Sequence, residues 1–152
     1  WDALDVFAPV LGQMDLRLLI AEAVKHGRIP KTCDFKQAFC QSILPPNGMY
    51  VITPPPNCPL IPPNTYLLLK KTLYGLKRSP RHWFDKCSSI LKQLGLQSCP
   101  NAPRLYSGTI IPNHPTLYIG LYVDDCIYFC KSQHVEIYIY MCVCPFSWSL
   151  LT

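Results

Sequence analysis

Eight prolines lie within residues 45–63, and they restrict the fold more than any other feature of the sequence. Proline fixes φ and lacks a backbone N–H, so this stretch can form neither a helix interior nor a central strand. We therefore expect a long surface excursion around one short extended piece, residues 49–53. The excursion separates an N-terminal helix and strand from the rest of the chain.

The segment before the prolines has helical periodicity. Asp15 is the expected N-cap, Gly27 and then Pro30 end the helix, and four apolar residues between them recur at helical spacing: Leu16, Leu19, Ile20 and Ala23. Residues 31–35 then read as a short strand that ends near Asp34.

The segment after the prolines contains a second helix between two strand-like regions. Residues 65–69 read as a strand, Ser79 as the N-cap of a helix with Pro80 at its first position, and Gly95 as its end. An apolar stripe follows the helix start: Trp83, Phe84, Cys87, Ile90, Leu91 and Leu94. Residues 116–121 and 126–130 predict a β-hairpin. The order helix, strand, long loop, helix, hairpin is typical of an α+β domain.

Composition narrows the class of protein. With 152 residues, 49% of them hydrophobic and 15% charged, the chain suits one globular domain and not a disordered segment. The net charge of +5 is compatible with a polyanionic partner but does not establish one. The nine cysteines are odd in number and form no CxxC pair, which indicates buried apolar thiols in a reducing compartment. Residues 137–151 carry no charge, yet the run is short and Pro145 interrupts it, so we expect no membrane span.

The stretch LYVDDCIYF places Asp124 and Asp125 inside an apolar, strand-like run. The simple interpretation is a hairpin tip, where aspartate is a common turn residue. If Asp34 ends a central strand and the pair lies at the turn of an adjacent hairpin, however, three carboxylates converge on one sheet edge, although 90 sequence positions separate residue 34 from residue 124. Converging carboxylates repel one another unless a cation is present, and Mg²⁺ binds one or two carboxylates together with substrate phosphates. The residues alone leave both interpretations open.

Five blocks, in a fixed order, make the chain resemble the reverse transcriptase of Ty1/copia-type retrotransposons over roughly residues 5–134. They are FAPV with LRLL (7–10 and 16–19), CDFKQAF (33–39), MYV with the prolines after it (49–51), KKTLYGLKRSPRHWFDK (70–86) and YVDD (122–125). The fourth block is long and specific, whereas YVDD alone would be weak.

The resemblance implies a polymerase palm-like antiparallel sheet with packed helices, incomplete fingers and no thumb. It implies a partial fingers/palm domain over residues 1–134 and a divergent apolar tail over residues 135–152. Asp34 and Asp124 match the family's metal ligands and Asp125 their companion, so these three are the expected catalytic residues. They would hold two Mg²⁺ ions, with Mn²⁺ as a substitute.

The resemblance also assigns binding roles. Phe39 matches the aromatic residue under the incoming sugar, where a ring would exclude a 2′-OH; an ordinary core phenylalanine is the alternative. Tyr74 and Gly75 match the block that lines the nucleotide pocket. Three basic residues of the cluster that begins at Lys70 and Lys71 would meet phosphates, a solvated basic face being the alternative: Lys77, Arg78 and Arg81. The family more often has Gln at position 78, and Trp83 and Phe84 are expected in the core.

The implied reaction is attack of a primer 3′-OH on a dNTP, templated by RNA or DNA. The implied partners are an RNA or DNA template with its primer, dNTPs, and the RNase H and integrase domains of a full element. The implied compartment is a cytoplasmic virus-like particle, with the nucleus as the alternative. Two departures favour a second hypothesis: no KxRLV-like finger stretch is present, and the match ends near His134. The second hypothesis is a catalytically inactive retroelement remnant that at most binds nucleic acid.

Overall fold

The computed structural model describes residues 8–46, 49–56, 58–62, 64–110, 112–113 and 116–130. Its elements are α1 (Gln13–Lys25), β1 (Lys31–Asp34), the 3₁₀ helix η2 (Phe39–Gln41), β2 (Val51–Ile52), β3 (Leu67–Leu68), α2 (Ser79–Gln93), β4 (Gln97–Cys99), β5 (Ala102–Gly108), β6 (Leu117–Tyr122) and β7 (Asp125–Phe129).

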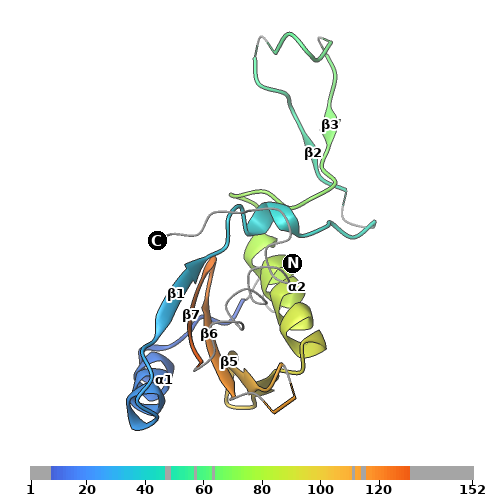
Figure 1. Cartoon of the computed structure of the whole chain (residues 1–152). Coiled ribbons are helices and arrows are strands. Elements are labelled where there is room, and N and C mark those ends of the chain that lie inside the picture. Colours follow the sequence, from blue (N-terminus) through green and yellow to red (C-terminus); the bar gives the residue numbers. More distant parts are fainter. Residues whose placement is uncertain are drawn as a thin grey trace.

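Five of the strands form one sheet in the order β1-β7-β6-β5-β4, and every neighbouring pair is antiparallel. The helices α1 and α2 lie on opposite faces of this sheet (Figure 1). The strands β2 and β3 pair separately and project away from the sheet as a ribbon. The predicted α+β class with an antiparallel sheet is confirmed.

Alternation along the strands divides the core between the two faces. On β6, Leu117, Ile119 and Leu121 pack in the cluster that contains the buried side of α2. Tyr118 faces the other way and joins the smaller cluster around α1. Because successive side chains of a strand point to opposite faces, one strand serves both clusters.

The apolar stripe predicted for α2 is buried as expected, including Trp83 and Leu91. The predicted cap is wrong, because the helix begins at Ser79 and its N-cap is Arg78. The Ser79 hydroxyl donates instead to the carbonyl oxygen of Leu73, at 2.5 Å. The serine therefore ties the preceding loop to the helix, while Gly95 ends the helix as predicted, with φ +88°.

The start of α1 also differs from the prediction. Its N-cap is Gly12, and Asp15 lies at the third helical position. From there the Asp15 carboxylate accepts the Gly12 backbone N–H at 3.2 Å. An acidic residue in the first turn also interacts favourably with the positive end of the helix dipole. Gly27 follows the helix with φ +61°, as its predicted role requires.

The strands β4 and β5 are absent from the sequence-based prediction. The signal is hidden because β5 contains a proline and a buried cation, Arg104, which is 3% exposed. Its guanidinium lies over the Phe84 ring at 4.6 Å from the centroid, so a charged residue occupies a core position through a cation–π contact. These two strands complete the sheet beyond the predicted hairpin.

Several predictions concern the cysteines and the tail. Cys33, Cys87 and Cys126 are buried, while Cys99 is exposed, so the expectation of buried thiols holds for part of the set. Within the described ranges, no helix is long and apolar enough to cross a membrane. The tail over residues 135–152 lies outside the described residues.

Candidate metal centre

The pairing of β1 with β7 brings two of the three predicted carboxylates together. Asp34 is the direct partner of Asp125 across the two strands. The next pair in the same register is hydrogen-bonded, because the Phe35 N–H donates to the Asp124 carbonyl at 2.8 Å. Hydrogen-bonded and non-hydrogen-bonded pairs alternate, so Asp34 and Asp125 form a non-hydrogen-bonded pair, with Cα atoms about 4.5 Å apart and side chains on one face. The strand that ends at Asp34 and the Asp124–Asp125 hairpin are thus adjacent, as predicted. The expectation of a central strand is wrong, because β1 is an edge strand of the sheet formed by the described residues.

The three carboxylates interact electrostatically. Burial raises the pKa of Asp125, and the negative charges of Asp124 and Asp34 raise it further. A side-chain hydrogen bond with Asp34 acts in the same direction. This is the behaviour expected where like charges share a site.

Asp124 lies in the turn between β6 and β7, and Asp125 is the first residue of β7. The prediction of a turn at or near the pair is confirmed. Val123, the other turn residue, has φ +47°, a left-handed conformation that is unfavourable for a β-branched side chain. The Val123 carbonyl accepts the indole N–H of Trp83 at 2.8 Å. The turn is therefore connected to α2 behind it.

The predicted nucleotide-pocket residues are close to one another and to the carboxylates. The rings of Phe39 and Tyr74 are 4.7 Å apart between centroids. Phe39 is 8% exposed and Tyr74 is 53% exposed, so the tyrosine ring covers the phenylalanine. Burial raises the pKa of Tyr74, and the charge of Asp124 is the next largest cause, which places the phenol within electrostatic reach of the carboxylates. Gly75 has φ +94°, a conformation that favours glycine.

The predicted basic residues lie at the start of α2 and just before it. Lys77 is exposed, and Arg78 and Arg81 are half-buried. The Arg81 Nε donates to the Asp85 carboxylate at 2.9 Å, so part of its charge is already compensated. Burial lowers the pKa of His82, and the charge of Arg78 lowers it further. The basic residues thus lie close together near the start of α2, and the ion pair with Asp85 reduces the charge that Arg81 contributes.

The donor chemistry of the carboxylates fits Mg²⁺. Carboxylate oxygens are hard ligands, and Mg²⁺ takes only one or two of them when substrate phosphates and water complete its octahedron. In the described part of the chain, no three His, Cys, Asp or Glu side chains form a set that could by itself hold a metal ion. The structure therefore presents carboxylates that fit as part of a shell, not a preformed protein cage.

Comparison with known proteins identifies the family of the chain. Residues 1–139 match the family model described as reverse transcriptase (RNA-dependent DNA polymerase). The chain belongs to this reverse transcriptase family. The copia-type resemblance in the sequence is thereby confirmed.

The relatives of this reverse transcriptase domain are transposon polyproteins. Over 94 residues it is 31% identical to the retrovirus-related Pol polyprotein from transposon RE1 of Arabidopsis thaliana. This match covers 62% of the chain and 6% of the relative. Over 129 residues it is 26% identical to the retrovirus-related Pol polyprotein from transposon TNT 1-94 of Nicotiana tabacum. This second match covers 85% of the chain and 10% of the relative. The chain thus spans a tenth or less of the relatives' length, and no solved structure matches it.

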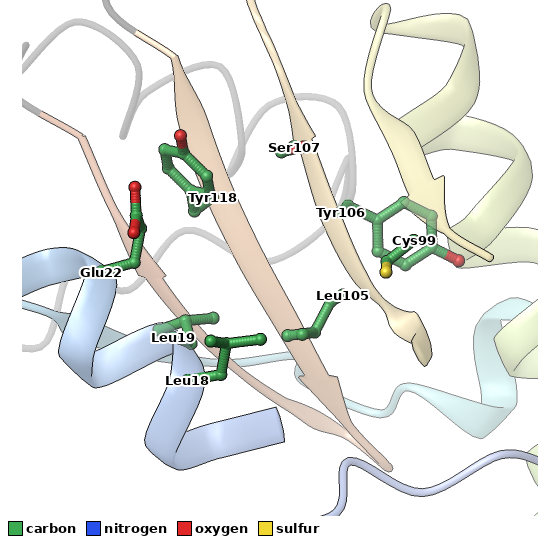
Figure 2. A pocket seen from close by; sticks show the side chains of 8 residues that line it. All are labelled: Leu18, Leu19, Glu22, Cys99, Leu105, Tyr106, Ser107 and Tyr118. Carbon is green, nitrogen blue, oxygen red and sulfur yellow. The ribbon is translucent and has the colours of Figure 1, made fainter. Parts of the chain in front are cut away.

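One cavity of the reverse transcriptase domain lies away from the carboxylates. It has a volume of about 250 Å³ and is bounded by Leu18, Leu19 and Glu22 of α1 and by Leu105 and Tyr118 of the sheet. Figure 2 shows these side chains converging between the helix and strands β5 and β6. A hydrogen bond with His26 lowers the pKa of Glu22. The recess is mainly apolar, and Glu22 is the one carboxylate among the described residues that line it.

Sequence reasoning did not find the residues that support the site of this domain. Thr72 donates its hydroxyl to the Phe39 carbonyl and its N–H to the Ser42 carbonyl, the latter at 2.9 Å. Lys86 Nζ donates to the Gln41 carbonyl at 2.7 Å. The Thr72 bonds fix the segment that carries Phe39 against the loop that carries Tyr74, and the Lys86 bond fixes it against α2. They are contacts between distant segments, so no local sequence signal reveals them; the Trp83 indole, expected only to pack, belongs to the same group.

Proposed function

We propose that this chain provides the nucleotidyl-transfer centre of an RNA-directed DNA polymerase. The observation that carries the proposal is the direct cross-strand pairing of Asp34 with Asp125, beside Asp124, in a chain of the reverse transcriptase family. Family membership supplies the reaction class, and the pairing supplies a reason for carboxylates to occupy adjoining strands. We further propose that the antiparallel sheet is a polymerase palm.

Asp34, Asp124 and Asp125 would hold two Mg²⁺ ions, with Mn²⁺ as a substitute. When bound, the metal supplies activation of the primer 3′-OH and stabilisation of the departing pyrophosphate. The mutual repulsion that raises the pKa of Asp125 favours cation binding, since a cation relieves it. The carboxylates themselves bind and orient, and their separation across β1 and β7 sets where the reacting phosphate can lie.

Phe39, Tyr74 and Gly75 would form the dNTP pocket. The Phe39 ring is held by Tyr74 and by the Thr72 hydroxyl bond to its own carbonyl, so it cannot move aside easily. A fixed ring under the sugar would exclude a 2′-OH and so select deoxyribonucleotides. Lys77, Arg78 and Arg81 would contact template and primer phosphates, with Arg81 weakened by its pairing to Asp85.

The wider assignments are proposals of the same kind. We assign residues 1–134 to the partial fingers/palm domain and residues 135–152 to a divergent tail. The partners would be an RNA or DNA template with its primer, dNTPs, and the RNase H and integrase domains of the full element. The reaction would take place in cytoplasmic virus-like particles.

The test is primer extension on poly(rA)/oligo(dT) with Mg²⁺. Asp124→Asn should lower the extension rate at least about a hundredfold, because removing a ligand removes several kcal/mol of transition-state stabilisation. Asp15→Asn is the matched control: it removes one negative charge at the start of α1 and should leave the rate unchanged.

No extension by a soluble, folded sample would overturn the catalytic proposal for this chain. Nucleic-acid binding that Mg²⁺ leaves unaffected would then favour the inactive remnant, acting through the basic cluster at the start of α2.

A further inference from the structure

Both carbonyl groups of the turn between β6 and β7 accept a hydrogen bond from outside the hairpin. The Val123 carbonyl accepts from the Trp83 indole, and the Asp124 carbonyl accepts from the Phe35 N–H, each at 2.8 Å. The first donor belongs to α2 and the second to the residue after β1. The turn that carries Asp124 is therefore held at the carbonyl groups of both of its residues.

The turn needs this support because its backbone is strained. Val123 has φ +47°, and a β-branched residue seldom adopts this region. Strained conformations persist only where the surroundings fix them, and they gather at functional sites. Val123 also packs against the main core cluster, so its side chain and its carbonyl are both restrained from the α2 side.

Trp83 is a rigid point from which to hold the turn. It is 2% exposed, and its ring meets the Phe35 ring edge-on, at 5.3 Å between centroids. Phe35 follows Asp34 directly, and Val123 precedes Asp124 directly. One indole thus contacts the immediate neighbours of two carboxylate residues that come from distant parts of the chain.

We propose that Trp83 is a positioning residue whose indole N–H, through the Val123 carbonyl, sets the place of the Asp124 carboxylate relative to Asp34 and Asp125. The inference deepens the proposed function and rests on it for the role of the carboxylates. In a purely structural role, any buried acceptor would satisfy the indole N–H. The N–H matters here because without it the Val123 carbonyl would lose its partner against a buried ring.

The decisive experiment replaces Trp83 in the full chain with β-(3-benzothienyl)alanine, which keeps the ring shape and lacks the N–H. Two quantities are measured: the Kd for Mn²⁺, from the electron paramagnetic resonance of the free ion, and the backbone amide resonances of Asp124 and Asp125 without metal. We expect the Mn²⁺ Kd to rise about fivefold to tenfold, the net worth of one hydrogen bond, and both amide resonances to shift.

Leu91→Val is the matched control, because it perturbs the same buried face of α2 two turns further along the helix. It should lower the Tm and leave the Mn²⁺ Kd unchanged. Val123→Gly provides the rescue, since glycine adopts positive φ without strain and the turn then depends less on the bond. In that background, the effect of the benzothienyl replacement on the Mn²⁺ Kd should shrink.

An unchanged Mn²⁺ Kd together with unchanged Asp124 and Asp125 amide resonances would overturn the proposal. A lower Tm with an unchanged Mn²⁺ Kd would also overturn it, because the indole would then act only in packing. A wild-type chain that binds no Mn²⁺ would refute the proposed function instead. In that case the amide resonances alone decide whether the indole holds the turn.

Discussion

The two faces of the five-stranded sheet are covered in different ways. The face toward α2 carries the main core, and the largest side chains of that helix are fully enclosed. The face toward α1 has a smaller cluster, with Leu19 and Ala23 as the buried residues of the helix, and it leaves Met14 and Leu18 exposed. Asp34 and Asp125 lie on this second face, as does the cavity beside α1. The closely packed α2 face thus supports the sheet from behind, while Asp34 and Asp125 lie on the less covered α1 face.

The largest expected effect tests the difference in packing directly. Leu91→Ala on α2 should lower the free energy of unfolding by about 3 kcal/mol, because the side chain is 1% exposed and its removal leaves a cavity. Leu18→Ala on α1 should change it by less than about 0.5 kcal/mol, because Leu18 is 61% exposed. Urea unfolding of both variants measures the two values. Equal losses would show that the α1 face is as tightly packed as the other.

A second pair of variants adds one methyl group to each face. An added Cβ at Gly108 would lie 2.6 Å from the Gly95 carbonyl oxygen, a backbone atom that cannot easily move. Gly108→Ala should therefore lower the free energy of unfolding by about 2 kcal/mol.

The matched change on the open face is Gly120→Ala, where the Cβ would meet the side-chain ends of Leu11 and Leu19 at 3.1 and 3.2 Å. These ends can shift, so the loss should stay below about 1 kcal/mol. Thermal unfolding of the two alanine variants, side by side, gives the comparison. A larger loss at Gly120 would mean that α1 is held more rigidly than its exposure indicates.

The smallest expected effect concerns charge on the open face. The raised pKa of Asp125 means that the folded chain keeps this proton to a higher pH than the unfolded chain does. The free energy of unfolding therefore falls as the pH rises from 3.8, the ordinary pKa of an aspartate, through the raised pKa of Asp125. Asp125→Asn removes this loss, so its Tm advantage over the wild type should grow from acid to neutral pH.

Added Mg²⁺ should reduce that advantage, because the cation relieves the repulsion in the wild type. Melting curves across the pH range, with and without Mg²⁺, measure both effects. An advantage that is independent of pH would show that the carboxylates do not interact in the folded chain.

The sequence predicted the elements that have strong local signals. Both helices, β1 and the β6–β7 hairpin follow from periodicity and from turn residues. The sequence pattern puts Ser79 and Asp15 at N-cap positions that Arg78 and Gly12 occupy in the structure. Local patterns do not show that the Leu73 carbonyl accepts the Ser79 hydroxyl. The strands β4 and β5 were missed because a buried arginine on an aromatic ring looks like an exposed residue in sequence.

The candidate site was predictable in its residues but not in its geometry. Asp34, Asp124 and Asp125 are predicted from the family motifs, and the structure pairs Asp34 with Asp125 across β1 and β7. Which two carboxylates face each other depends on the register of β1 with β7, which only long-range pairing decides. The same holds for the Trp83 bond to Val123, since its two partners are 40 positions apart.

The pairing of β1 with β7 also has a consequence for the order of folding. The contacts within β4–β7 join strands that are neighbours in sequence, whereas β1 must find β7 across some ninety residues of chain. Closing so long a loop costs more conformational entropy than forming a hairpin between consecutive strands, so β1 should join the sheet last. On a ribosome, Asp34 is made early and must wait until residue 125 has emerged. We therefore expect the pairing of Asp34 with Asp125 to be among the last contacts of the sheet to form.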